Sequence, residues 1–135
     1  MLQVKTYLDK SSIHGTGVFA AQEIKKGDLI WRFSPTMDKV IDVIEMIDIA
    51  YSKNKIERDF IDIYSFYDKQ LGKWILPTDN DRFTNHSDFP NTAAIKNGDV
   101  IANKNIIIGE ELTINYYEID GFAEDKFLKK EKSNA

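Results

Sequence analysis

Residues 82–91 read RFTNHSDFPN, and further along the chain residues 109–117 read GEELTINYY. The first stretch combines amides, hydroxyls, a histidine and a proline turn, and the second ends a short apolar run on two tyrosines. Tyrosine hydroxyls need hydrogen-bonding partners when they are buried, so neither stretch is typical of an ordinary strand or helix. We therefore predict that two loops lie side by side and build one polar, aromatic-walled site.

The composition is that of one soluble domain. The chain has 135 residues, of which 42% are hydrophobic and 30% charged, with a formal net charge of −4. This length can bury a self-standing core. The acidic balance argues against direct nucleic-acid binding, which needs a basic face, and suits a cationic partner such as a lysine-rich peptide. No membrane span and no signal peptide are expected, which favours an intracellular protein.

The chain has no cysteine and only two histidines. Disulfides, thiol nucleophiles and thiolate zinc sites are therefore excluded. A metal site built on His14 and His86 would need carboxylates to complete it, so we expect no metal.

Hydrophobic periodicity predicts a mainly β chain with an inserted helical segment near residues 36–63. One helix is expected near 36–51, with Ser34 as its N-cap followed by Pro35, and a second near 55–63. A hairpin turn is expected at residues 97–99, which read NGD. Alternation and turn signals predict strands at residues 2–8, 18–21, 29–33, 64–67, 73–76, 92–96, 100–103 and 112–115.

Three motifs carry candidate chemistry, and each also has a purely structural interpretation. The glycines in residues 14–17, which read HGTG, allow close backbone approach to a ligand, but a simple turn needs them equally. The loop around Asn85 could present polar groups to a ligand or only satisfy its own backbone. His86 could be a general base, although a structural hydrogen-bonding role is the commoner one. Tyr116 and Tyr117 are expected to point to opposite sides of a strand, one toward a site.

In this order, the motifs resemble those of the SET-domain protein-lysine methyltransferases. Residues 15–20 (GTGVFA) are similar to the family's Gly-x-Gly element, residues 82–91 to its Arg-Phe-x-Asn-His-Ser-x-x-Pro-Asn motif, and residues 109–116 to its Gly-Glu-Glu-Leu-Thr-x-x-Tyr motif. The last two are long and specific. The chain is similar in size to the minimal, stand-alone viral and bacterial members.

The resemblance implies a β-clip-like fold of several small sheets around a pseudoknot. The segment carrying Asn85 and His86 would be threaded beside the strand that ends at Tyr116. The whole chain, residues 1–135, would be a single SET domain with its core at about 4–117. Without the resemblance we would not predict such threading, which is rare among folds.

The resemblance also implies a cofactor, S-adenosylmethionine. Backbone groups of His14, Gly15, Thr16 and Gly17 would meet its amino-acid end and ribose. The other residues implied for cofactor binding are the side chain of Asn85, the backbone of His86, and Tyr116.

By the same resemblance, Tyr116 is the central catalytic residue and Tyr64 a second one that walls a lysine channel. Methyl transfer requires the amine, the methyl carbon and the sulfonium to be in line. A lysine ammonium, with a pKa of about 10.4, must first lose its proton, which desolvation in an aromatic channel promotes. Tyr67 lies close enough in sequence to compete with Tyr64 for the wall position. Channel-lining residues are expected to be Tyr64, Ile114, Tyr117 and Phe122.

Three features depart from the common family pattern. Asn115 stands where many members have aspartate, and we expect little consequence. Ile114 stands where an aromatic residue often limits the number of methyl groups, so the degree of methylation is open. The segment 118–135 lacks the family's cysteine-rich zinc module, so something else must close the channel. Phe122 and Phe127 are candidates for this lid, or simple anchors of the tail, and a partner subunit is a third candidate, which would make the protein a homodimer.

The function implied is an S-adenosylmethionine-dependent protein-lysine N-methyltransferase. Its partner would be a lysine-bearing protein, either a histone or another basic protein. The alternative is a catalytically inactive SET module that binds peptides or acts as a scaffold. The presence of Tyr116, Asn85 and both glycines together favours the enzyme.

Overall fold

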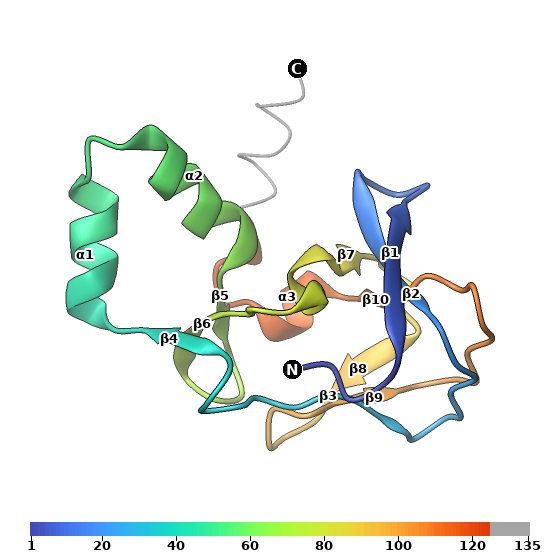
Figure 1. Cartoon of the computed structure of the whole chain (residues 1–135). Coiled ribbons are helices and arrows are strands. Elements are labelled where there is room, and N and C mark those ends of the chain that lie inside the picture. Colours follow the sequence, from blue (N-terminus) through green and yellow to red (C-terminus); the bar gives the residue numbers. More distant parts are fainter. Residues whose placement is uncertain (125–135) are drawn as a thin grey trace.

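The computed structural model describes residues 1–124, and this part of the chain forms small sheets with a few short helices (Figure 1). This confirms the predicted mainly β fold class. In chain order the elements are β1 (Thr6–Lys10), β2 (Thr16–Ala20), β3 (Leu29–Trp31), β4 (Lys39–Ile41), α1 (Val43–Tyr51), α2 (Lys55–Tyr64), β5 (Phe66–Asp68), β6 (Lys73–Leu76), the 3-10 helix η1 (Asn80–Phe83), β7 (Asn85–His86), β8 (Thr92–Ala94), β9 (Val100–Ala102), β10 (Thr113–Ile114) and α3 (Tyr116–Ile119).

Two antiparallel three-stranded sheets, in the orders β3-β9-β8 and β4-β6-β5, form the body. The antiparallel β1–β2 hairpin stands beside them. Their inner faces bury one apolar core, because successive side chains of a strand point to opposite faces. The core residues include Val18, Ile24, Ile30, Trp31, Ile75, Ile106, Leu112 and Ile114.

Most strands lie close to their predicted positions, but the first does not. The prediction placed it at residues 2–8, whereas β1 starts at Thr6 and Leu2 makes only an isolated bridge to Trp31. The partner decides the bounds here, since β1 extends only as far as its register with β2 allows. The turn predicted at residues 97–99 is confirmed: Gly98 has a φ of +88°, and the Ile95 amide donates to the Asp99 carbonyl at 2.8 Å.

The first helix was predicted too long. Residues 35–37 form a turn and Lys39–Ile41 form β4, so α1 begins only at Val43. Its N-cap is Asp42, whose carboxylate accepts a hydrogen bond from the Glu45 amide at 2.8 Å. Ile41, only 2% exposed, is held in the sheet by its pairing with Trp74. Pairing with β6 therefore overrode the helical spacing of the apolar residues.

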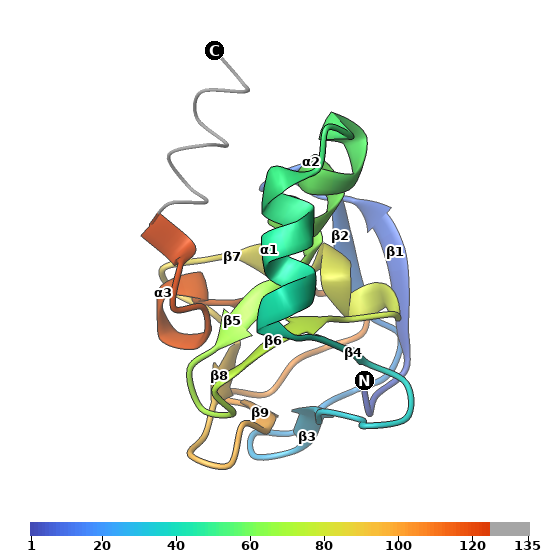
Figure 2. The ribbon, with the colours of Figure 1, turned by 90° about the vertical axis from the view of Figure 1, so that its left-hand side faces the viewer.

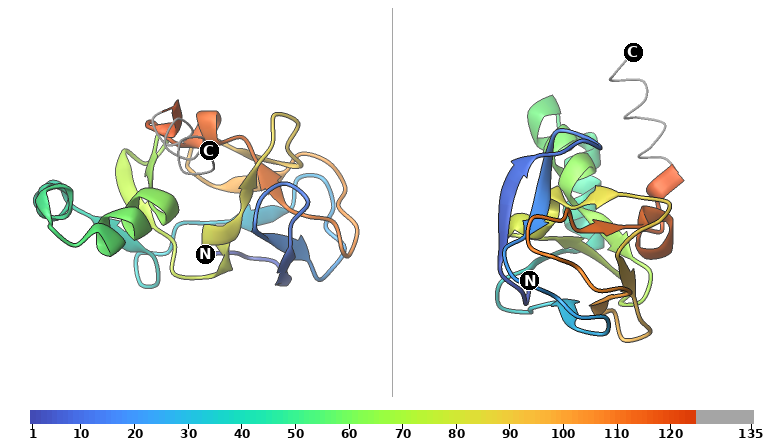
Figure 3. Two further views of the ribbon diagram at one scale, coloured as in Figure 1. Left: turned by 90° about the horizontal axis from the view of Figure 1, so that it is seen from above. Right: turned by 90° about the vertical axis from the view of Figure 1, so that its right-hand side faces the viewer.

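The second helix was predicted within one residue. α2 begins after Asn54, whose side-chain oxygen accepts from the amides of Ile56 and Glu57. Tyr64, expected in a strand, is instead the last residue of α2, and β5 begins at Phe66. Figures 1 to 3 show α1 and α2 standing off from the sheets, on the side opposite the β1–β2 hairpin.

Among the described residues, none of the helices has both the length and the apolar character to cross a bilayer. Phe127, expected to close the channel or to anchor the tail, lies outside the described residues. Phe122 lies inside them and is treated with the site below.

Candidate functional site

The two long motifs meet in a parallel strand pair. β7 pairs with β10, with Asn85 opposite Thr113 and His86 opposite Ile114, and the Ser87 amide donates to the Ile114 carbonyl at 3.0 Å. Parallel neighbours so far apart in sequence need a long crossover, here the whole 87–112 segment. The predicted threading of the Asn85 segment beside the second motif is confirmed.

A buried asparagine locks the two motifs together beyond this pair. Asn91, 6% exposed, donates through Nδ2 to the Glu111 carbonyl at 2.8 Å and to Glu110 Oε2 at 3.1 Å. Its Oδ1 accepts from the Thr113 amide at 2.9 Å. The neighbouring Thr92 hydroxyl donates to the Thr113 carbonyl at 2.7 Å. The Pro-Asn end of the first motif is therefore a clasp for the second.

Asn85 connects the same pair to the glycine turn. Its Nδ2 donates to the His14 carbonyl at 2.9 Å and also contacts the Thr16 carbonyl at 3.4 Å and Glu111 Oε1 at 3.2 Å. The side chain is 93% buried (7% exposed), so these acceptors satisfy a donor that would otherwise be costly to bury. Of the residues predicted to bind the cofactor, His14, Thr16 and Asn85 are thus brought into direct contact.

The two glycines of the turn have different structural reasons. Gly15 has a φ of +48°, which favours glycine, and a Cβ there would meet nothing within 4 Å. Gly17 is extended, but a Cβ there would lie 1.8 Å from Glu111 Oε1. Gly15 therefore supplies the conformation, whereas Gly17 makes room for a carboxylate of the second motif.

His86 is held by hydrogen bonds at both ring nitrogens. Nδ1 accepts from the Tyr116 amide at 3.0 Å, so the proton of the neutral ring lies on Nε2, which is 2.9 Å from Asp88 Oδ1. The ring also contacts Tyr116 and Tyr117 edge-on, with centroids 5.4 and 5.6 Å away. These contacts match the structural interpretation of the His86 side chain; its backbone role toward a cofactor stays a prediction.

Tyr116 was predicted to end a strand, but it starts α3. The turn comes from Asn115, which caps α3 by accepting from the Tyr117 amide at 3.0 Å. The Tyr116 hydroxyl donates to the carbonyl of Thr84, the residue directly before Asn85. Burial, and then the negative charge of Asp81, raise the pKa of the Tyr116 phenol well above its usual value. The phenol is therefore neutral at physiological pH and acts as a hydrogen-bonding group, not as a base.

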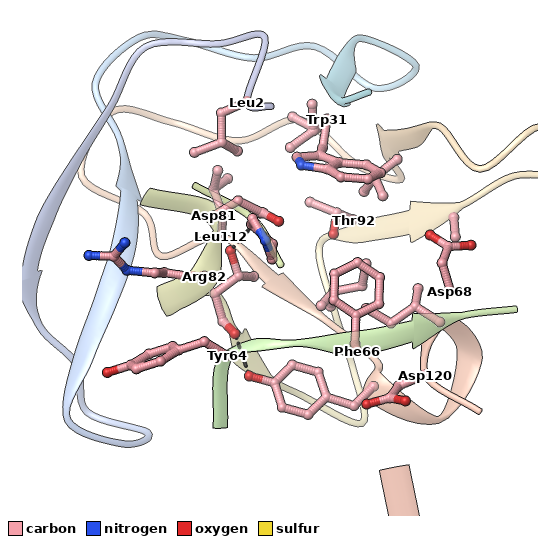
Figure 4. Close-up of a pocket in the computed structure, with 18 of the residues that line it drawn as sticks. Leu2, Trp31, Tyr64, Phe66, Asp68, Asp81, Arg82, Thr92, Leu112 and Asp120 are labelled. Atoms are coloured by element: carbon pink, nitrogen blue, oxygen red, sulfur yellow. Dashed lines mark hydrogen bonds between the residues drawn. The ribbon is translucent and has the colours of Figure 1, made fainter. Parts of the chain in front are cut away.

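Tyr116 lines a cavity of about 90 Å³ that reaches from Leu2, near the N-terminus, to Ile119 in α3. Figure 4 shows Leu2 and Trp31 at one end and Tyr64 and Asp120 at the other. The walls are mostly apolar and aromatic, with Ile30, Trp31, Ile63, Tyr64, Phe66, Leu112, Ile114, Tyr116 and Ile119, and the polar residues include Asp68, Asp81, Thr84 and Asp120.

Tyr64 and Ile114 thus share one cavity with Tyr116, as the channel prediction requires. Tyr64 packs edge-on against Phe83, with centroids 5.7 Å apart, and the Arg82 guanidinium lies 5.8 Å from its ring centroid. Its competitor Tyr67 is not among the cavity-lining residues and packs against Trp74 instead.

Tyr117 and Phe122, also predicted for the channel, do not line this cavity. They border a neighbouring hollow with Lys69 and Asp120. Phe122 stacks on Trp74 with centroids 4.9 Å apart. Tyr116 and Tyr117 were expected on opposite sides of a strand, but both lie in α3, where Tyr116 lines the cavity and Tyr117 is 42% exposed.

Sequence reasoning missed three residues that shape the site: Asp81, Thr84 and Glu111. Asp81 lies directly before the RF of the first motif, and burial raises its pKa to about 7, with the charge of Asp79 adding to the effect. Glu111 is part of the second motif, and its carboxylate contacts both Asn85 and the Gly17 position. Only Glu111 had a usable signal, its place in the motif.

Comparison with known proteins agrees with this geometry. A family model described as SET domain matches residues 15–117. The chain therefore belongs to the SET-domain family, as the motifs predicted. A comparison with curated protein sequences found no match.

Solved structures share the fold. The S-adenosylmethionine-bound, autoinhibited Polycomb repressive complex 2 of Chaetomium thermophilum is similar, with a TM-score of 0.67 and 22% identity over 96% of this chain. The apo form of that complex gives 0.62, 21% and 96%. This chain spans 17% of the length of each of these chains. A candidate histone methyltransferase of Plasmodium falciparum gives a TM-score of 0.52 and 27% identity, over 85% of this chain and 95% of that one.

Proposed function

We propose that the protein is an S-adenosylmethionine-dependent protein-lysine N-methyltransferase that acts on a lysine in a basic protein segment, such as a histone tail. The single observation that carries the proposal is the position of Tyr116. Its neutral hydroxyl lies at an aromatic-walled cavity and donates a hydrogen bond to the Thr84 carbonyl. The next residue, Asn85, donates to the His14 carbonyl and so holds the glycine turn. The phenol therefore lies between the cavity, which would take the lysine, and the glycine turn, which would hold the cofactor, and methyl transfer between the two requires a group at this position.

The residues around the glycine turn fit the proposed cofactor. The turn residues 12–16 are exposed, the space beside Gly15 is open, and the Asn85 amide donates to the His14 carbonyl of the turn. Polar backbone groups of this kind suit the charged amino-acid end of the molecule. Residues 14–17, Asn85 and His86 would hold it, and when bound it supplies an electrophilic methyl group on a sulfonium.

The cavity residues account for the other half of the reaction. Apolar and aromatic walls disfavour a charged ammonium and promote loss of its proton, while the faces of rings such as Tyr64 and Phe66 still attract the cation as it arrives. Because the pKa of the Tyr116 phenol is raised, Tyr116 cannot take that proton at neutral pH. We assign it instead the orientation of the amine, through a hydrogen bond from the amine to the phenol oxygen.

Cofactor binding is tested first by thermal unfolding with and without S-adenosylmethionine. At a hundredfold excess over the dissociation constant, binding adds about 2.7 kcal/mol to the free energy of unfolding. Transfer is then measured with isotope-labelled cofactor and a panel of histones and other basic proteins. Stabilisation without transfer to any protein would favour the inactive SET module. The absence of both stabilisation and transfer would refute the proposal.

Tyr116→Phe is expected to lower transfer at least a hundredfold while cofactor affinity changes less than threefold. The substitution keeps the ring and removes only the hydroxyl that contacts Thr84. Tyr7→Phe is the matched control, since Tyr7 stacks on Phe19 in the β1–β2 hairpin, away from the cavity. A Tyr116→Phe variant that transfers normally, or that loses cofactor binding, contradicts the assigned role.

Asn85→Ala is expected to weaken cofactor binding at least tenfold. It removes the amide that holds the His14 carbonyl and leaves the turn without its buried donor. Isothermal titration calorimetry measures the affinity. Asn105→Ala, which removes an exposed amide that accepts from the Lys26 amide, is the control. Unchanged affinity in Asn85→Ala would move Asn85 to a purely structural role.

A further inference from the structure

The carbonyl that receives the Tyr116 hydroxyl is itself held by a second residue. Thr84 follows η1, and its amide donates to the Asp81 carbonyl at 2.9 Å. The Thr84 hydroxyl donates to Asp81 Oδ1 at 3.2 Å. Asp81 therefore holds Thr84 at two points, one through the backbone and one through the side chain, directly behind the bond to Tyr116.

Asp81 is an expensive residue to place here. Its carboxyl lines the same cavity as Thr84 and Tyr116, and burial disfavours its charged form. It is fixed from behind, because Asp79 Oδ1 accepts from the Asp81 amide at 3.2 Å while Asp79 Oδ2 accepts from the Leu2 amide at 2.8 Å. A carboxyl is unfavourable at this position, and its oxygen accepts a hydrogen bond from the Thr84 hydroxyl. Together these two facts indicate a role for Asp81 at the cavity.

We propose that Asp81 is a positioning residue for methyl transfer, acting through the Thr84 hydroxyl to hold the Thr84 carbonyl against the Tyr116 phenol. This rests on the proposed function, because it assumes that Tyr116 orients the amine. The Thr84 carbonyl has its direction set by the Asp81 contacts. Without them, the phenol loses its fixed acceptor and samples other orientations.

Two single variants test the chain of contacts. Asp81→Leu removes the side-chain acceptor at similar size, and Thr84→Val removes the hydroxyl while keeping the carbonyl. Each is expected to lower kcat about tenfold, with KM for cofactor and peptide within threefold of the parent values. Asp81→Asn retains an Oδ1 acceptor and is expected to recover kcat to within threefold of the parent. Thr78→Val, which removes an exposed hydroxyl bonded to the Met37 carbonyl, is the matched control with unchanged kcat.

The double variant Asp81→Leu/Thr84→Val is expected to be no slower than either single variant, because both break one connection. Additive losses, or a change in KM alone, would overturn the proposal, as would an Asp81→Asn variant as slow as Asp81→Leu. If Asp81→Leu does not fold, Thr84→Val and Asp81→Asn decide the matter alone, since a Thr84→Val variant with parental kcat overturns the proposal by itself.

A readout without turnover separates this proposal from the function on which it rests. The ¹³Cζ resonance of Tyr116, assigned by its loss in Tyr116→Phe, reports the hydrogen bond of the phenol. It is expected to shift in Asp81→Leu and Thr84→Val and to stay in place in Asp81→Asn and Thr78→Val. Shifts in a protein that transfers no methyl group would leave the positioning geometry intact and sink the proposed function. Transfer with no shift in either disruptive variant would sink the positioning role alone.

Discussion

Replacing Gly17 by alanine is a direct test of how the glycine turn and the second motif fit together. An added Cβ would lie 1.8 Å from Oε1 and 2.8 Å from Cδ of Glu111, and 3.1 Å from Cβ of Ser11. The first two distances are impossible contacts, so the Glu111 carboxylate must move. Since it is the far end of a flexible side chain, it can turn away without moving the backbone.

The cost of Gly17→Ala therefore comes mainly from what the carboxylate leaves behind. Glu111 Oε1 accepts from Asn85 Nδ2 at 3.2 Å, and a hydrogen bond to a charged group contributes about 1.5–3 kcal/mol. Asn85 keeps its bond to the His14 carbonyl, and Glu111 is only half-buried, which reduces the loss. The tight contact with Ser11 adds about a few tenths of a kcal/mol to this loss. We expect a total loss of about 1–2 kcal/mol in the free energy of unfolding.

Urea denaturation measures this loss, and a second substitution locates its origin. In the Glu111→Ala background the clash is absent, so Gly17→Ala is expected to cost less than about 0.5 kcal/mol there. Gly15→Ala is the comparison: its Cβ meets nothing, and its cost of about 1 kcal/mol comes from the positive φ and persists in both backgrounds. A Gly17→Ala penalty that is equally large without the Glu111 carboxylate would refute the steric reasoning.

Two further predictions concern the polar groups Asp81 and Asn91. The pKa of the Asp81 carboxyl is raised to about 7 from its usual 3.8, so this group binds more protons in the folded state and is expected to lower the free energy of unfolding as the pH rises from 4 to 8. Asp81→Asn removes this contribution, so its free energy of unfolding relative to the parent should rise by about 2 kcal/mol over that range, half of the ~4 kcal/mol that the full shift implies, because the residue is partly exposed. A difference that does not change with pH would contradict the raised pKa. Asn91→Ala should lower the free energy of unfolding by about 3 kcal/mol in urea titrations, because it leaves the Thr113 amide and the Glu111 carbonyl unpaired, and a loss under 1 kcal/mol would show that water replaces the clasp.

The sequence predicted the elements of the fold where local patterns and tertiary pairing agree. Residues 73–76 were predicted as a strand, and they form β6 over that range because both neighbours, β4 and β5, pair with it. The helical spacing of the apolar residues predicted α2 to within one residue, and the Asn54 cap seen in the structure agrees with that start. Residues 36–42 show the opposite case: their apolar spacing suits a helix, but pairing with β6 was stronger, and pairing is not visible in local sequence.

The candidate site was predictable only through its motifs. Their resemblance to the family placed Asn85 beside the second motif and Tyr116 at a cavity, which no periodicity argument could do, since β7 and β10 have two residues each. Asp81 and Thr84 escaped prediction because their roles depend on side-chain contacts within a 3-10 turn. The separation of Phe122 from the cavity escaped it as well, because stacking on Trp74 is a tertiary contact.

The single residue Asn115 shows how a departure from the family pattern can leave the site intact. At the end of β10 the chain must leave the strand and turn into α3 so that the Tyr116 phenol reaches the Thr84 carbonyl. The turn is made by a side-chain oxygen that accepts from the Tyr117 amide, which asparagine and aspartate provide almost equally well at an N-cap. Asn115 is not among the residues that line the cavity at Tyr116, so we expect the absence of a negative charge there to have little effect. The turn that brings Tyr116 to Thr84 therefore depends on a property that the two residues share, the side-chain oxygen that caps α3.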